Sequence, residues 1–162
     1  MARILVVDDE PDVRELFNIT LKMAGHTTET AKDGLEAVEK LEAEIPDLIL
    51  LDLMMPRLDG FGFLTRIRTE MDDKPMRVLI ATAKVLEEAD HQKLSAWPVV
   101  GVLNKGELDI GQMVIDVSSA LKRSPRPNGK ETKPPDTAPP EQEAPAHQAV
   151  EITAEASDLA AR

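Results

Sequence analysis

The stretch that decides the fold is ILVVDDEPD, residues 4–12, in which a short apolar run ends abruptly in acidic residues. Four apolar residues with no polar alternation are typical of a β-strand that is covered on both faces. Such strands occur mainly in parallel sheets with helices on either side. We therefore expect Asp8, Asp9 and Glu10 to stand at the carboxyl end of a buried strand.

The chain up to residue 123 repeats this alternation of strand and helix. Helical spacing of apolar residues begins after Pro11 and stops at Gly25. Four further runs are predicted as strands, over residues 26–30, 47–51, 76–81 and 98–103. Helical patterns are predicted after them, over residues 35–45, around residues 63–67, and over residues 84–96 and 107–122. This order predicts the α/β class, with a doubly wound, five-stranded parallel sheet joined by right-handed crossovers.

Composition separates the end of the chain from the rest. With 162 residues, the chain has room for one domain with its own core. Seven of the twelve prolines lie in residues 124–162, which are rich in Ala and Glu and contain no aromatic residue. Such a segment buries too little apolar surface to offset its ordering entropy. We predict one domain over residues 1–123 and a disordered Pro/Ala/Glu-rich tail over residues 124–162.

Charge and cysteine content narrow the class of protein. The formal net charge of −11 argues against direct binding of nucleic acid through a basic face. There is no Cys, so neither disulfides nor thiolate metal sites are available, which fits a reducing compartment. The N-terminal apolar run is too short for a signal peptide, and no run approaches the roughly 18 apolar residues of a membrane span. These features predict a cytoplasmic protein without membrane insertion.

Reactive side chains follow several of the predicted strands. Residues just past the carboxyl ends of parallel strands share one edge of the sheet, where ligands bind. The edge should gather three carboxylates, a hydroxyl and an ammonium group, from Asp8, Asp9, Asp52, Thr82 and Lys105. Clustered carboxylates repel one another, and with only oxygen ligands on offer Mg²⁺ is favoured over Zn²⁺. Asp52 is the predicted nucleophile for a phosphoryl group, whose oxygens Thr82 and Lys105 would stabilise.

Four motifs, in this order and spacing, resemble the receiver domain of bacterial two-component response regulators: VVDDEP, LILLDLMMPRLDGFGFL, VLIATA and GVLNK. Asp52 follows Asp9 by 43 residues, Thr82 follows Asp52 by 30, and Lys105 follows Thr82 by 23, close to the family's intervals. The resemblance covers residues 1–123. It implies the (βα)5 flavodoxin-like version of the predicted fold.

The resemblance also implies a role for each matching residue. Asp52 would be the phosphoacceptor, receiving a phosphoryl group from a phosphohistidine on a sensor histidine kinase or a histidine phosphotransfer protein. Asp9 would bind Mg²⁺ directly, Asp8 through water, and Met54 through its backbone carbonyl. The protein would then be a signalling switch rather than an enzyme. It would act through contacts with an unknown downstream protein, and a homodimer formed on phosphorylation stays open.

Two positions depart from the family pattern. Val102 stands where the family has an aromatic residue, three positions before the lysine. We expect this change to spare phosphorylation chemistry and to alter the route from the phosphate to the fourth helix, fifth strand and fifth helix. Gly106 stands where proline normally follows the lysine, which predicts a more adaptable loop and a less firmly held Lys105.

Two other functions stay open at this point. A receiver-like scaffold that no longer takes phosphate is kept open by Val102 and Gly106. A Mg²⁺-dependent phosphohydrolase would share the aspartyl-phosphate chemistry. Haloacid dehalogenase-like enzymes, however, carry their nucleophile in a D-x-D pattern on the first strand, which residues 8–10 do not offer. Taken singly, each site residue has an ordinary structural explanation, so the prediction rests on their joint placement.

Overall fold

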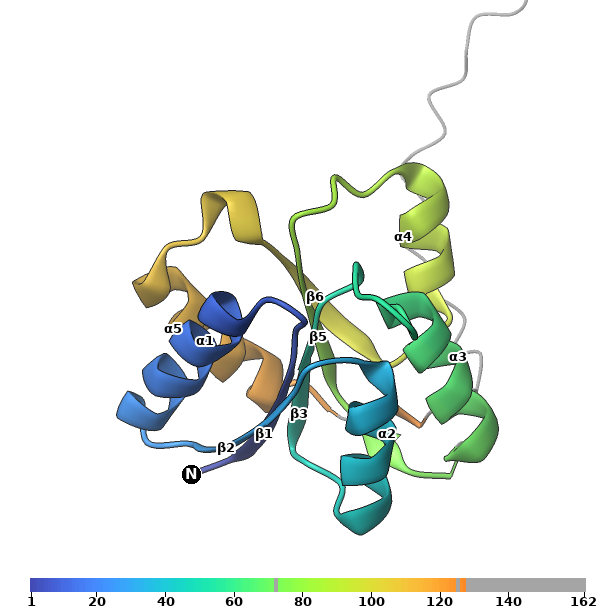
Figure 1. Cartoon of the computed structure of the whole chain (residues 1–162), viewed down its shortest axis with the longest axis horizontal. Helices are drawn as coiled ribbons and strands as arrows, with labels where there is room; N and C mark the ends of the chain where they lie inside the picture. Colours follow the sequence, from blue (N-terminus) through green and yellow to red (C-terminus); the bar gives the residue numbers. More distant parts are fainter. Residues whose placement is uncertain (72, 125, 128–162) are drawn as a thin grey trace, which may run out of the picture. The chain divides into compact units, whose positions relative to one another are not determined.

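The computed structural model describes residues 1–71, 73–124 and 126–127 (Figure 1). Five parallel strands form one sheet: β1 (Arg3–Val7), β2 (Thr27–Ala31), β3 (Leu48–Leu51), β5 (Val78–Thr82) and β6 (Val99–Asn104). Their order across the sheet is β2-β1-β3-β5-β6. The predicted α/β class and five-stranded parallel sheet are confirmed. The strands β2 and β6 are its edges.

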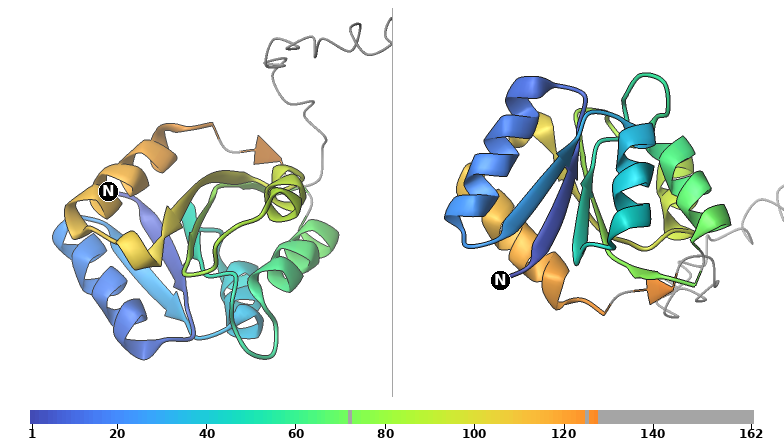
Figure 2. Two further views of the ribbon diagram at one scale, coloured as in Figure 1. Left: turned by 90° about the horizontal axis from the view of Figure 1, so that it is seen from above. Right: turned by 60° about the horizontal axis from the view of Figure 1, so that its bottom comes forward.

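Helices cover both faces of the sheet, as Figure 2 shows. One face is covered by α1 (Pro11–Met23) and α5 (Ile110–Lys122), and the other by α2 (Gly34–Ala43), α3 (Gly60–Glu70) and α4 (Glu88–Ser95). Alternate residues of β1 enter the two cores: Ile4 and Val6 pack on the α1/α5 side, and Leu5 and Val7 on the other. Burial on both faces explains why the strand shows no polar alternation.

The strand register sets which residues meet at the carboxyl edge. Val7 of β1 pairs with Leu51 of β3, and Leu51 pairs with Ile80 of β5. At the far side of β5, Thr82 pairs with Asn104. The next residues along β1, β3 and β6 therefore leave the sheet at one edge. These residues are Asp8, Asp52 and Lys105.

Several predicted boundaries were wrong. The helix predicted from residue 84 begins at Glu88, because a loop precedes it and the Asp90 side chain accepts a hydrogen bond of 3.1 Å from the Glu87 N–H at its first turn. The helix predicted from residue 107 begins at Ile110, where Asp109 accepts a hydrogen bond from the Gln112 N–H. A 3₁₀ turn, Lys105–Glu107, stands before it. The strand predicted over residues 76–81 is instead β5, beginning at Val78.

A second, two-stranded sheet was not predicted. In it β4 (Pro75–Met76) pairs antiparallel with β7 (Arg126–Pro127). The Arg77 Nε donates a hydrogen bond of 2.6 Å to the Arg123 carbonyl beside this pair. Of the segment predicted as a disordered tail, residues 124–162, the structure describes Ser124, Arg126 and Pro127, and the rest lies outside the described residues.

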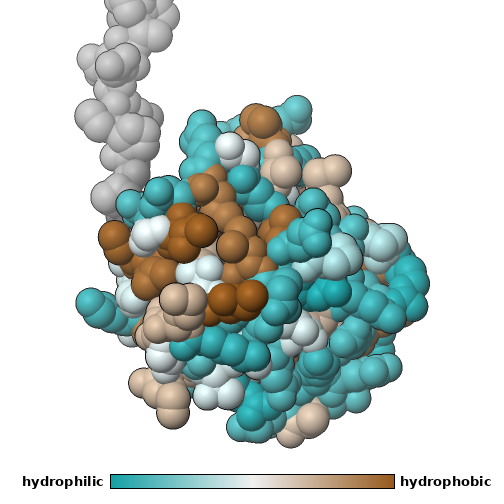
Figure 3. Space-filling model, turned by 60° about the vertical axis from the view of Figure 1, so that its left-hand side comes forward, coloured by the Kyte–Doolittle hydropathy of each residue, from teal (hydrophilic) through white to brown (hydrophobic). Residues whose placement is uncertain are grey.

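Apolar side chains reach the surface on the side that carries α1 and α5. The exposed residues there are Leu16, Ile19, Met23, Ile110 and Ile115. Figure 3, in which this side comes forward, shows apolar surface gathered on it. Contiguous apolar surface of this kind is typical of sites of protein contact. None of the helices in the described ranges is long and apolar enough to cross a membrane.

Candidate functional site

Four carboxylates meet at the carboxyl edge of the sheet. Asp8, Asp9, Glu10 and Asp52 each offer an oxygen, and these oxygens lie within 4.8 Å of one another. Asp8 is 1% exposed and Asp52 4% exposed, whereas Glu10 is exposed. The register of β1 and β3 brings them together, since the Asp52 N–H donates to the Val7 carbonyl at 2.9 Å. The sequence prediction included three of the four and missed Glu10.

Lys105 neutralises part of the charge of this acidic group. Its Nζ lies 2.9 Å from Asp52 Oδ2, 2.5 Å from Asp8 Oδ2 and 3.3 Å from Glu10 Oε1. The Lys105 side chain is only 7% exposed. It stands in the 3₁₀ turn after β6, where the Gly106 N–H donates to Asn104 Oδ1 at 2.9 Å. That Gly106 leaves Lys105 less firmly held stays a prediction.

Burial and charge shift two proton affinities in the site. Burial raises the pKa of the Asp8 carboxyl above its ordinary value, against the hydrogen bonds and charge of Lys105 and the Glu10 N–H, which lower it. Burial alone would lower the pKa of Lys105, but its hydrogen bonds to Asp8 and Asp52 outweigh this, so the pKa stands above its ordinary value. Lys105 is therefore charged at neutral pH.

The donor set fits a hard divalent cation. Asp8 Oδ1 accepts a hydrogen bond from the Glu10 N–H at 2.9 Å. Asp8 Oδ2 is buried and lies 2.5 Å from Lys105 Nζ. Four carboxylates that each place an oxygen within 4.8 Å of the others match the all-oxygen coordination that Mg²⁺ prefers. The residues present can therefore hold a magnesium ion.

Thr82 ends β5 at the same edge and is buried. Its Oγ1 accepts a hydrogen bond of 3.2 Å from the Lys84 N–H. The Lys84 ammonium turns away to Asp90, with Nζ 2.8 Å from Oδ1. The hydrogen bond from Lys84, with one from the Glu87 N–H, holds the pKa of Asp90 below its ordinary value. This pairing fixes the loop that follows Thr82.

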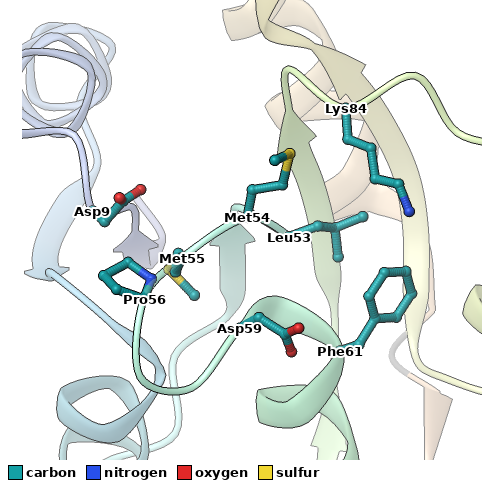
Figure 4. Close-up of a pocket in the computed structure, with 8 residues that line it drawn as sticks. All are labelled: Asp9, Leu53, Met54, Met55, Pro56, Asp59, Phe61 and Lys84. Atoms are coloured by element: carbon teal, nitrogen blue, oxygen red, sulfur yellow. The ribbon is translucent and has the colours of Figure 1, made fainter.

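A pocket of about 520 Å³ opens beside the acidic group (Figure 4). Its lining is mainly apolar and comes from Asp9, Leu53, Met54, Met55, Pro56, Asp59, Phe61 and Lys84. Figure 4 shows Asp9 and Lys84 on opposite sides of the β3–α3 loop, with Phe61 below Lys84. The Lys84 Nζ lies 5.5 Å from the centre of the Phe61 ring. Asp9 belongs both to the pocket and to the acidic group.

The structure thus brings together most of the predicted site. Asp8 and Asp52 contact Lys105, Asp9 belongs to the same acidic group, and Thr82 lies at the same edge. The Met54 N–H donates to Asp52 Oδ1 at 3.1 Å, so the Met54 peptide is adjacent to the group, while its carbonyl as a metal ligand stays a prediction. Val102, on β6, stands where the family has an aromatic residue, and its side chain is 43% exposed.

The family described as "Response regulator receiver domain" matches residues 4–114, more than half of the chain. The chain belongs to this family. The receiver resembles "Response regulator MprA" of Mycobacterium ulcerans (strain Agy99), with 47% identity over 86 residues. It also resembles "Probable transcriptional regulator ycf27" of Guillardia theta, with 38% identity over 94 residues. The matches cover 53% and 58% of this chain but only 37% of each relative.

Solved structures share the receiver fold over most of the chain. CheY4 of Vibrio cholerae, a chemotaxis protein, matches with a TM-score of 0.67 and 30% identity, covering 74% of this chain and 98% of CheY4. The response regulator TrrA of Thermotoga maritima, in complex with Mg(2+)-BeF, matches with a TM-score of 0.62 and 32% identity. That match covers 74% of this chain and 99% of TrrA. The flavodoxin-like form of the fold is therefore confirmed.

Proposed function

We propose that this receiver is a phosphorylatable switch that accepts a phosphoryl group from a phosphohistidine onto Asp52. The observation that carries the proposal is the position of the Asp52 carboxylate. It lies at the end of a central strand, beside three other carboxylates and 2.9 Å from the Lys105 ammonium. A carboxylate so placed is a nucleophile with a cation ready to neutralise the incoming phosphoryl oxygens.

In the transfer, an Asp52 oxygen forms a bond to phosphorus as the bond from phosphorus to the donor imidazole nitrogen breaks. The electron pair leaves with the imidazole, which takes a proton from solvent. Lys105 stabilises the phosphoryl oxygens. Thr82 Oγ1 already accepts the Lys84 N–H, so its own proton is available to donate a hydrogen bond to the phosphoryl group.

The cofactor of this reaction is Mg²⁺. Asp8, Asp9 and Asp52, with the backbone carbonyl of Met54, would hold it, Asp8 through water. When bound, Mg²⁺ supplies positive charge that offsets repulsion between the carboxylates and the phosphoryl oxygens. The similarity to TrrA, whose structure is a complex with Mg(2+)-BeF, supports this assignment.

The proposed partners are proteins. A sensor histidine kinase or a histidine phosphotransfer protein would deliver the phosphoryl group, and a downstream protein in the cytoplasm would read it. The exposed apolar residues on α1 and α5 support output through protein contacts, including a homodimer formed on phosphorylation. On this proposal the receiver is a regulator that promotes only its own phosphorylation and dephosphorylation.

The test is incubation with acetyl phosphate and Mg²⁺, followed by intact mass measurement. We expect one added phosphoryl group, absent in Asp52→Asn. Asp59→Asn is the matched control and should retain the adduct, because asparagine can still cap α3 at the Gly62 N–H. An adduct that persists in Asp52→Asn would contradict the assignment. Rapid turnover of many phosphate esters would favour a phosphohydrolase, and no adduct in the wild type would favour a scaffold.

A further inference from the structure

The β3–α3 loop, residues 53–59, is closed at its neck. The Gly60 N–H donates to the Leu53 carbonyl at 3.0 Å, and the Met54 N–H donates to the Asp52 carboxylate at 3.1 Å. A Cβ at Gly60 would lie 2.6 Å from the Asp52 carbonyl oxygen, so the two ends of the loop pass each other at backbone contact. The two ends of the loop are therefore fixed next to the proposed phosphoacceptor. These contacts do not hold the tip of the loop, residues 56–58, in place.

The tip of the loop rests on the beginning of α2. Arg57 Nη2 forms an ion pair with Asp33 Oδ2. The next residue, Leu58, packs its carbonyl so close to Gly34 that an added Cβ would lie 2.9 Å away. Among the described residues, Arg57 alone of the non-glycine residues has a positive φ, at 67°. A strained backbone persists only where surrounding contacts determine it, and here the ion pair supplies one.

Each oxygen of the Asp33 carboxylate makes a different contact. It is 2% exposed, and its Oδ1 accepts a hydrogen bond of 3.0 Å from the Glu36 N–H as the N-cap of α2. Its Oδ2 faces the guanidinium of Arg57, which is more than half exposed. Removing Arg57 would leave the buried Asp33 carboxylate without its counterion. The carboxylate of Asp33 therefore draws the loop tip onto α2.

We propose that Arg57 and Asp33 are positioning residues, whose ion pair anchors the β3–α3 loop to α2 and so fixes the Met54 peptide and the pocket wall beside Asp52. Neither residue is part of the acidic group or lines the pocket. The consequence for phosphorylation rests on the proposed function. The anchoring itself can be measured without it.

The test uses the full chain with Arg57→Asn, Asp33→Asn and the double variant. Asparagine tolerates the left-handed backbone at residue 57, and at residue 33 it keeps an oxygen for the cap. Without Mg²⁺, we expect hydrogen exchange of the Met54 and Gly60 amides to accelerate in each single variant. The double variant should be no faster, because each change breaks the same contact. Mg²⁺ affinity, followed by titration, should fall about tenfold in each, as for changes to residues that orient ligands.

A matched control is Arg66→Asn, which removes an ion pair of 2.9 Å to Glu70 within α3. It should leave both measurements unchanged, and Arg57→Lys should restore slow exchange. Wild-type exchange in Arg57→Asn, additive effects in the double variant, or acceleration spread equally over all strands would each overturn the proposal. If the amides and Mg²⁺ affinity respond as expected while the wild type forms no acetyl phosphate adduct, the proposed function fails and the anchor stands.

Discussion

The central strands β1 and β3 and the edge strand β6 contribute to the same site under different constraints. All four residues of β3 are buried, and its next residue is Asp52. In β6 only two of six residues are buried, although the strand delivers Lys105. The residues of a central strand must pack into both cores as well as place a site residue. In the edge strand most side chains are not buried, so the main constraint is the position of its carboxyl end. Both departures from the family pattern, Val102 and Gly106, accordingly lie in or just after β6.

The largest expected effect comes from truncating a central strand. Leu51→Ala should lower the free energy of unfolding by about 2–5 kcal/mol, because it opens a cavity where the side chain is fully buried. Val102→Ala, at the exposed position of β6, should change it by less than about 0.5 kcal/mol. Urea unfolding of both variants measures the difference. Equal decreases in the free energy of unfolding would contradict the proposed difference between the central strand and the edge strand.

A smaller effect is expected from removing the cation that β6 supplies. Lys105→Ala should still form the acetyl phosphate adduct at saturating Mg²⁺, because the metal provides part of the neutralisation. Its rate should fall about 100-fold, the usual cost of losing one group that stabilises developing charge. Intact mass followed over time measures this rate. A wild-type rate, or no adduct at all, would contradict the prediction that Mg²⁺ and Lys105 each neutralise part of the phosphoryl charge.

The smallest expected effect concerns the pair of Lys84 and Asp90, next to Thr82. The pKa of Asp90 is lower in the folded state than its ordinary value of 3.8. The ionised carboxylate therefore stabilises the fold at pH values above 3.8, and this stabilisation is lost as the pH falls through the lowered pKa. Asp90→Asn should therefore melt below the wild type at pH 7, and the gap should close in acid. Thermal melts at several pH values test this, and Lys84→Met should show the same pattern. A gap that does not depend on pH would refute it.

Much of the fold could be predicted because the inner strands carry their signal locally. The apolar runs of β1, β3 and β5 are buried on both faces; Asp8 and Asp52 directly follow β1 and β3, and Thr82 is the last residue of β5. The small sheet of β4 and β7 could not be predicted in this way. Each of its strands has two residues, one of them proline, which is too short for any periodicity.

The features in and around the site that were not predicted depend on contacts between segments that are distant in the sequence. Arg57 and Asp33 each look like solvated turn residues, and only the packing of the β3–α3 loop against α2 pairs them. Glu10 looks like a residue that favours the start of α1, and its place in the acidic group follows from the register of β1 and β3. The start of α5 was foreseeable, since Asp109 is a favourable N-cap residue.

The reach of Lys105 has a consequence for how the domain assembles. Its ammonium compensates carboxylates that precede it by 95 residues, at Glu10, and by 53, at Asp52. In a chain without Lys105, the carboxylates that follow the first and third strands would lack their internal counterion. Lys105 thus links the ends of β1 and β3 to the residue that follows β6, and a chain that stops before β6 would depend on a bound cation to neutralise these carboxylates.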